Sequence, residues 1–101
     1  MLHARLLSIM RQEVTFRRLN LSSYGKKRIE GMILQGMQRM KTMGADNHPS
    51  HTMKAEKNLK GLIVYLADYS KKTGTFPHLS ETDFDAAMRE SPAFWPFCSA
   101  G

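Results

Sequence analysis

Residues 49–72, PSHTMKAEKNLKGLIVYLADYSKK, give the clearest structural signal in this sequence. Apolar side chains recur there at the three- and four-residue spacing of an α-helix that buries one face. Lysines gather on the opposite face, as is typical of a helix at the protein surface. Pro49 or Ser50 suits the first turn, and Gly74 suits the position after the last turn. We therefore predict a helix over residues 49–72 with a buried face made of Ala55, Leu59, Leu62, Ile63, Leu66 and Tyr69.

A second helix, predicted over residues 23–43, is rich in methionine. Leu34 projects away from its apolar face, between Lys27 and Lys41. The apolar face has two interpretations: ordinary core against the neighbouring helices, or in part a surface for a second chain, as Met-rich grooves are. At 100° per residue, the apolar arc of about 140° contains Ile29, Met32, Ile33, Gly36, Met37, Met40 and Met43.

Two further helices are predicted towards the ends of the chain. Residues 2–14 repeat apolar side chains at helical spacing. The last helix has a strong start signal, because Ser80 can cap it with Asp83 three residues later. That helix ends before Pro92, since a residue that precedes proline avoids the helical region.

The fold that these elements predict is all-α. Residues 92–101 form an aromatic, proline-broken tail, and no segment alternates in polarity convincingly enough to be a strand. Residues 1–101 are long enough for one domain and too short for two separate cores. We therefore expect a single helical domain, built as a small bundle of about four helices.

The supply of core-forming side chains is small. Ten Leu, four Ile, two Val and five Phe are joined by eight Met, which fill irregular gaps but specify a unique packing poorly. Small domains with few aliphatic side chains are hard to stabilise alone. We therefore expect a homodimer that completes the core of each copy.

Charge and cysteine content narrow the functional class. The net charge is +6, with the excess of cations in residues 1–60, and such asymmetry favours an acidic partner or a nucleic acid. Cys98 is the single cysteine, which rules out an internal disulfide and suits a reducing compartment, so we expect the cytoplasm. No apolar run approaches the roughly 20 residues of a membrane span, and no membrane association is expected.

No catalytic or metal centre is predicted. Asp46, His48 and His51 are three potential ligands in one loop, but tetrahedral zinc sites need further Cys or His at set spacing. Cys98 with a histidine could form a nucleophile and its base, but a thiol near a chain end is poorly placed for a preorganised pocket. The glycines are isolated and form no phosphate-binding loop. We therefore expect neither an enzyme nor a cofactor.

Basic side chains offer one possible function, which is nucleic-acid binding. Phosphate contacts need only exposed cations, whereas base reading needs Arg, Asn or Gln presented towards base edges, and no helix is marked for that. A lysine face is also ordinary solvated surface. The candidate nucleic-acid-binding residues are Arg17, Arg18, Lys26, Lys27, Arg28, Lys54, Lys57 and Lys60.

Residues 29–44, IEGMILQGMQRMKTMG, and residues 78–90, HLSETDFDAAMRE, resemble the small helical antiactivators of pseudomonad quorum sensing of the QslA type. This resemblance implies a protein that binds a transcription factor and blocks its dimerisation or its binding to DNA. The leading hypothesis is therefore a non-catalytic regulator that inhibits a partner protein. The expected partner is a transcription regulator, and nucleic-acid binding is the alternative function. The expected partner-binding residues are Met32, Leu34, Met37, Met40 and Met43.

Overall fold

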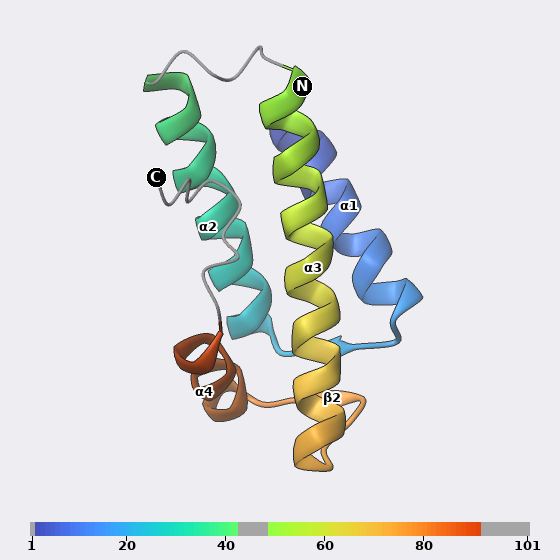
Figure 1. Cartoon of the computed structure of the whole chain (residues 1–101). Helices are drawn as coiled ribbons and strands as arrows, with labels where there is room; N and C mark the ends of the chain where they lie inside the picture. The colour runs from blue at the N-terminus through green and yellow to red at the C-terminus, as the bar shows by residue number, and fades with distance from the viewer. Residues whose placement is uncertain (1, 43–48, 92–101) are drawn as a thin grey trace.

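The computed structural model describes residues 2–42 and 49–91. Four helices make up most of this part of the chain, which confirms the predicted all-α bundle. They are α1 (Leu2–Phe16), α2 (Ser23–Thr42), α3 (Pro49–Thr73) and α4 (Glu81–Glu90). The first three lie side by side, with α1 and α3 pointing the same way and α2 pointing the opposite way, and α4 lies at the end where α2 begins (Figure 1).

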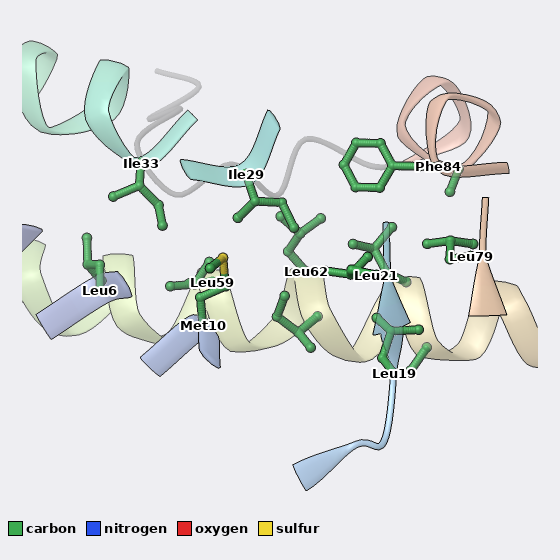
Figure 2. Packing of buried hydrophobic residues seen from close by; sticks show 14 of the residues in the cluster. Leu6, Met10, Leu19, Leu21, Ile29, Ile33, Leu59, Leu62, Leu79 and Phe84 are labelled. Carbon is green, nitrogen blue, oxygen red and sulfur yellow. The ribbon is translucent and has the colours of Figure 1, made fainter. Parts of the chain in front are cut away.

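The core lies between the three long helices and continues to α4 at one end. The buried face of α3 contributes Leu59, Leu62, Ile63 and Leu66, as its periodicity predicts. Leu6 and Met10 of α1 pack against one part of that face, and Ile29 and Ile33 of α2 pack against another (Figure 2). Ala55 is also buried, whereas Tyr69 is only partly buried.

Two short strands are present where none was predicted. β1 (Asn20–Leu21) follows α1 and β2 (His78–Leu79) follows α3, and the two pair in parallel. The Asn20 amide N–H donates to the Pro77 carbonyl at 2.7 Å. A strand of two residues is too short to produce an alternating sequence pattern. From the sequence alone, the leucine of each strand is therefore assigned to a loop. Leu21 and Leu79 are in fact core residues.

Helix ends agree with the sequence where a specific capping residue is present. Ser80 caps α4 by accepting a hydrogen bond from the Asp83 amide at 3.1 Å. Gly74 follows α3 with φ of +80°, the left-handed conformation that favours glycine. The end of α1 was placed two residues too early, because it closes on Arg18 at φ of +58°, and no side-chain type signals that conformation. The predicted end of the second helix, at residue 43, lies outside the described residues.

Tyrosine hydroxyls join α3 to α4. Tyr65 Oη donates to the Ala87 carbonyl at 2.6 Å, and Tyr69 Oη donates to the Glu90 carboxylate at 3.2 Å. Burial raises the pKa of both phenols, and the negative charge of Glu90 raises each pKa further. Both hydroxyls therefore remain protonated donors near neutral pH.

Gly25 of α2 packs closely against the Phe84 side chain of α4. A Cβ atom at this position would lie 3.2 Å from Phe84 Cδ2 and 3.5 Å from Leu21 Cδ2. The Phe84 ring is fully buried and packs edge-on against Tyr24, with 6.1 Å between the ring centroids. It therefore has little room to move. Gly31, on the same helix, would place a Cβ atom in open space.

These two glycines give a matched test of the packing between α2 and α4. We expect Gly31→Ala to stabilise the protein by about 1 kcal/mol, since alanine is the better helix former. Gly25→Ala should instead destabilise it, because the added methyl group presses on the Phe84 ring. Urea unfolding followed by circular dichroism measures both. Equal stabilisation by the two substitutions would contradict the close packing.

Candidate functional site

The methionine-rich face of α2 is divided between core and surface. Ile29 and Ile33 are fully buried, and Met40 is 6% exposed. Its role as a partner contact stays a prediction, but Met40 is a core side chain in this structure. The reason is that Met40 lies in the middle of the apolar arc, where α2 faces the rest of the bundle. Met43 lies outside the described residues.

Met32 and Met37 are partly buried and pack against the edges of the core. They do not share one surface, because residues five apart on a helix point about 140° away from each other. Met32 lies one turn beyond Arg28, which pairs with Asp85 of α4, whereas Met37 lines a hollow together with His3 of α1. The five predicted partner-binding residues are therefore not a single patch.

Leu34 and Met37 do come together. Leu34 is 47% exposed, which leaves a large apolar side chain in solvent near the middle of α2. With Met37 it lines a hollow of about 210 Å³ between α2 and the start of α1. The remaining lining residues are His3, Gln38 and Lys41.

A second hollow, of about 220 Å³, lies further along the same two helices. Met10 and Val14 supply its apolar lining, and three of its polar side chains carry charge: Arg11, Lys26 and Glu30. Glu30 lies one turn before Leu34 on α2, so the two hollows follow one another along the line where α1 and α2 meet. We call this pair of hollows the α1–α2 groove.

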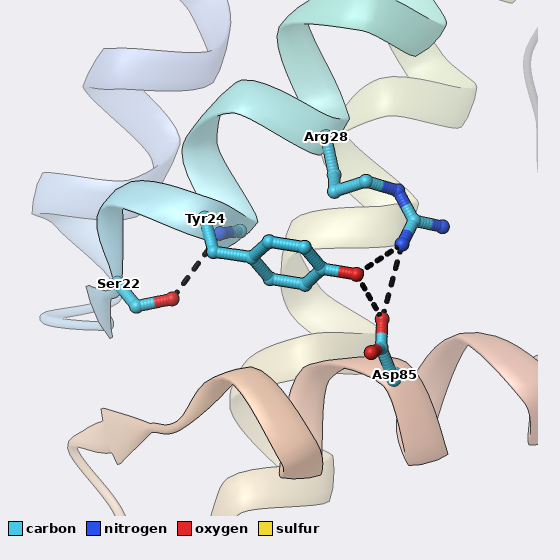
Figure 3. Close-up of polar contacts among 5 residues, drawn as sticks. Ser22, Tyr24, Arg28 and Asp85 are labelled. Carbon is cyan, nitrogen blue, oxygen red and sulfur yellow. Dashed lines mark hydrogen bonds and ion pairs between the residues drawn. The ribbon is translucent and has the colours of Figure 1, made fainter.

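Arg28 is committed to a contact within the protein. Its guanidinium donates to Asp85 Oδ1 at 3.0 Å and to Tyr24 Oη at 2.6 Å, and Tyr24 Oη itself donates to Asp85 at 2.7 Å (Figure 3). The guanidinium also lies 5.8 Å from the centroid of the Phe84 ring. Arg28 therefore links α2 to α4, and its role as a phosphate-binding cation stays a prediction.

The other candidate nucleic-acid-binding residues are exposed but fall into separate groups. Arg17 lies over the exposed Phe16 ring, 5.2 Å from its centroid, and pairs with Glu13 at 3.4 Å. Lys26 lines the α1–α2 groove. Among the described residues, none of the following forms an ion pair: Arg18, Lys26, Lys27, Lys54, Lys57 and Lys60.

The position of these groups along the bundle follows from an ion pair between α1 and α3. Arg5 pairs with Glu56, which holds the pKa of the arginine above its ordinary value. The lysines of residues 54–60 are therefore level with the start of α1. Arg17 lies twelve residues beyond Arg5, about 18 Å along the helix axis. The basic residues at the end of α1 and those on α3 are thus at different ends of the bundle.

A metal site was sought in residues 2–42 and 49–91. No group of three or more His, Cys, Asp or Glu side chains in these ranges could hold a metal ion. Asp46, His48 and Cys98 lie outside them. The helices of the described ranges also include none that combines the length and hydrophobicity of a membrane crossing.

Sequence reasoning missed half of the α1–α2 groove. It treated α1 only as a core helix, although His3, Arg11 and Val14 line the groove from that side. These positions lie at the edge of the α1 apolar face, and their spacings of eight and three residues keep them on one flank of the helix. The spacing can be seen in the sequence, but nothing in the sequence identifies which flank of α1 meets α2.

Comparison with known proteins gives no relative for this chain. No protein-family model matches it, and neither a curated protein nor a solved structure is significantly similar to it.

Because Met40 lies in the core and Leu34 lies in the groove, we expect substitutions at these two positions of α2 to change the free energy of unfolding by different amounts. We expect Leu34→Glu to change the free energy of unfolding by no more than about 0.5 kcal/mol, as for an ordinary surface position. Met40→Ala should cost about 2–4 kcal/mol, because it leaves a cavity in the core. Chemical denaturation measures both. A large loss in Leu34→Glu would mean that this leucine is needed for folding.

Proposed function

We propose that this chain is a non-catalytic regulatory protein that binds and inhibits a partner protein through the α1–α2 groove. The observation that carries the proposal is the exposed Leu34 beside the half-buried Met37 on one hollow. Single exposed leucines are common on protein surfaces. A leucine and a methionine that together line a hollow are instead typical of a binding surface, because a partner side chain can fill the hollow and exclude water.

Methionine suits this role physically. Its unbranched side chain changes shape at low cost and adapts to the contour of a partner. Met37 is anchored against the core by one part of its surface and lines the hollow with another. The partner would therefore meet an apolar floor with polar side chains at its rim, namely His3, Gln38 and Lys41, which is the usual arrangement of a protein interface.

The resemblance of residues 29–44 and 78–90 to QslA-type antiactivators favours a transcription regulator as the partner. Inhibition would follow if the bound segment is one that the regulator needs for dimerisation or for DNA contact. The single cysteine supports a reducing compartment, the cytoplasm. Homodimerisation stays part of the proposal, and light scattering after size exclusion measures it directly.

Partner capture tests the proposal. We expect Leu34→Glu and Met37→Gln each to abolish capture of a protein partner from cytoplasm treated with nuclease, because each removes apolar area from the hollow. The measurement is affinity purification followed by mass spectrometry, with helicity of each variant checked by circular dichroism.

Met53→Glu is the matched control for this experiment. Met53 is 68% exposed on α3 and does not line the α1–α2 groove. Its replacement removes a comparable exposed apolar side chain and adds the same charge as Leu34→Glu. Capture should therefore survive in Met53→Glu. Normal capture by both groove variants would overturn the proposed function.

Nucleic-acid binding is the second candidate function. The observation that favours it is the row of Lys54, Lys57 and Lys60 on α3, exposed and without an ion pair in the described residues. These side chains follow one another along the helix at three-residue spacing, so their charges lie near enough for one phosphate backbone. Such binding is electrostatic and needs no apolar hollow.

The electrostatic candidate predicts binding to duplex DNA or RNA that weakens steeply as salt is added. Replacing Lys54, Lys57 and Lys60 with glutamine should abolish a mobility shift at low salt, whereas Leu34→Glu should leave it unchanged. The absence of any shift by the unmodified protein at low salt would remove this candidate.

A further inference from the structure

The α1–α2 groove combines an apolar floor with a basic rim. Its lining includes the three cations Arg11, Lys26 and Lys41, against the single carboxylate of Glu30. Apolar contacts come from Leu34 and Met37 in one hollow and from Met10 and Val14 in the other. A segment that fills this groove must therefore be apolar on one side and acidic at its edges.

The length of the groove indicates the kind of segment that fits. Lys26 and Lys41 belong to different hollows and are fifteen residues apart on α2, which corresponds to about 22 Å. A helix of about four turns covers the same distance. The floor lies between two neighbouring helices, and an apolar stripe on a third helix packs into such a depression in the manner of helix-in-groove recognition.

A second copy of this chain does not provide a suitable occupant. Each copy carries a net charge of +6, and two grooves brought face to face would oppose their basic rims. The acid-rich helix of this chain, α4, packs Phe84 and Ala87 into its own core. Its Asp85 is already paired with Arg28. The acidic partner helix must therefore come from a different protein.

We infer that the α1–α2 groove binds an amphipathic helix with acidic flanks, supplied by the partner protein. This inference rests on the proposed function and adds the secondary structure and charge of the segment that is bound. The apolar stripe of the helix packs on Leu34, Met37 and Val14. Its carboxylates pair with Arg11 and Lys26 at one end and with Lys41 at the other.

A displayed library of 16-residue helices tests the inference. Every member carries an apolar stripe of Leu, Ile or Met at helical spacing, and its flanking positions are randomised between Glu and Lys. Selection on the immobilised protein should enrich Glu over Lys at the flanks at least tenfold. A selected peptide, made synthetically, should shift the amide resonances of Leu34, Met37 and Val14.

Two double variants of equal net charge separate the groove from the overall charge. Arg11→Glu with Lys26→Glu reverses charge in the groove, and Lys57→Glu with Lys60→Glu reverses charge on α3. We expect the first variant to lose the preference for Glu flanks and the second to retain it. Retention by the first variant, or enrichment of Lys flanks, would overturn the inference.

The remaining outcomes are also decisive. Failure to enrich any helix, or shifts confined to another face, would overturn the inference about the bound segment. Concentration-dependent dimers that Leu34→Glu dissociates would assign the groove to a second copy and overturn it as well. Loss of partner capture in Leu34→Glu does not depend on the library, so the proposed function can stand when the inference about the helix fails.

Discussion

The buried face of α3 is the constraint on which the remainder of the structure depends. Leu59, Leu62, Ile63 and Leu66 lie at the centre of the core, and α1 and α2 meet the bundle by packing against them or their neighbours. Burying such side chains contributes roughly 1.5–3 kcal/mol each, an upper estimate for a chain whose unfolded state is partly compact. Aliphatic residues are few in this sequence, and most of those in the described part of the chain belong to the core or pack against it, so the exposure of Leu34 is unusual.

The ends of the bundle are fixed by the connections between helices. The β1–β2 pair joins the chain after α1 to the chain after α3, and so sets these two helices in parallel. Phe84 packs beneath Gly25, and the linked side chains of Tyr24, Arg28 and Asp85 lie beside the Phe84 ring. With α4 on one flank and α1 on the other, α2 is held in a single rotation about its axis. That rotation decides which of its side chains reach solvent.

Sequence patterns specified the helices but not this rotation. A period of 3.6 residues is repeated over several turns, so the helices and the buried face of α3 were predictable. The strands were not, because two residues establish no period. The apolar arc of α2 included both Met40 and Met37, and only the position of α1 separates the buried one from the groove-lining one. Arg28 likewise looked like a free cation, since its partner Asp85 is 57 residues away in the sequence.

The same geometry distinguishes the two kinds of partner that a basic surface can attract. Cations such as Lys26 and Lys41 draw any polyanion towards the groove, whether nucleic acid or acidic protein, and this long-range attraction carries little specificity. A phosphate backbone gains nothing from the apolar floor, and burying Leu34 beneath it would leave polar groups of the nucleic acid poorly solvated. An acidic amphipathic helix can pair its carboxylates with the basic rim and bury its apolar stripe on the floor at the same time. Discrimination between a nucleic acid and an acidic helix therefore depends on Leu34 and Met37, while the lysines mainly govern the rate at which either partner is encountered.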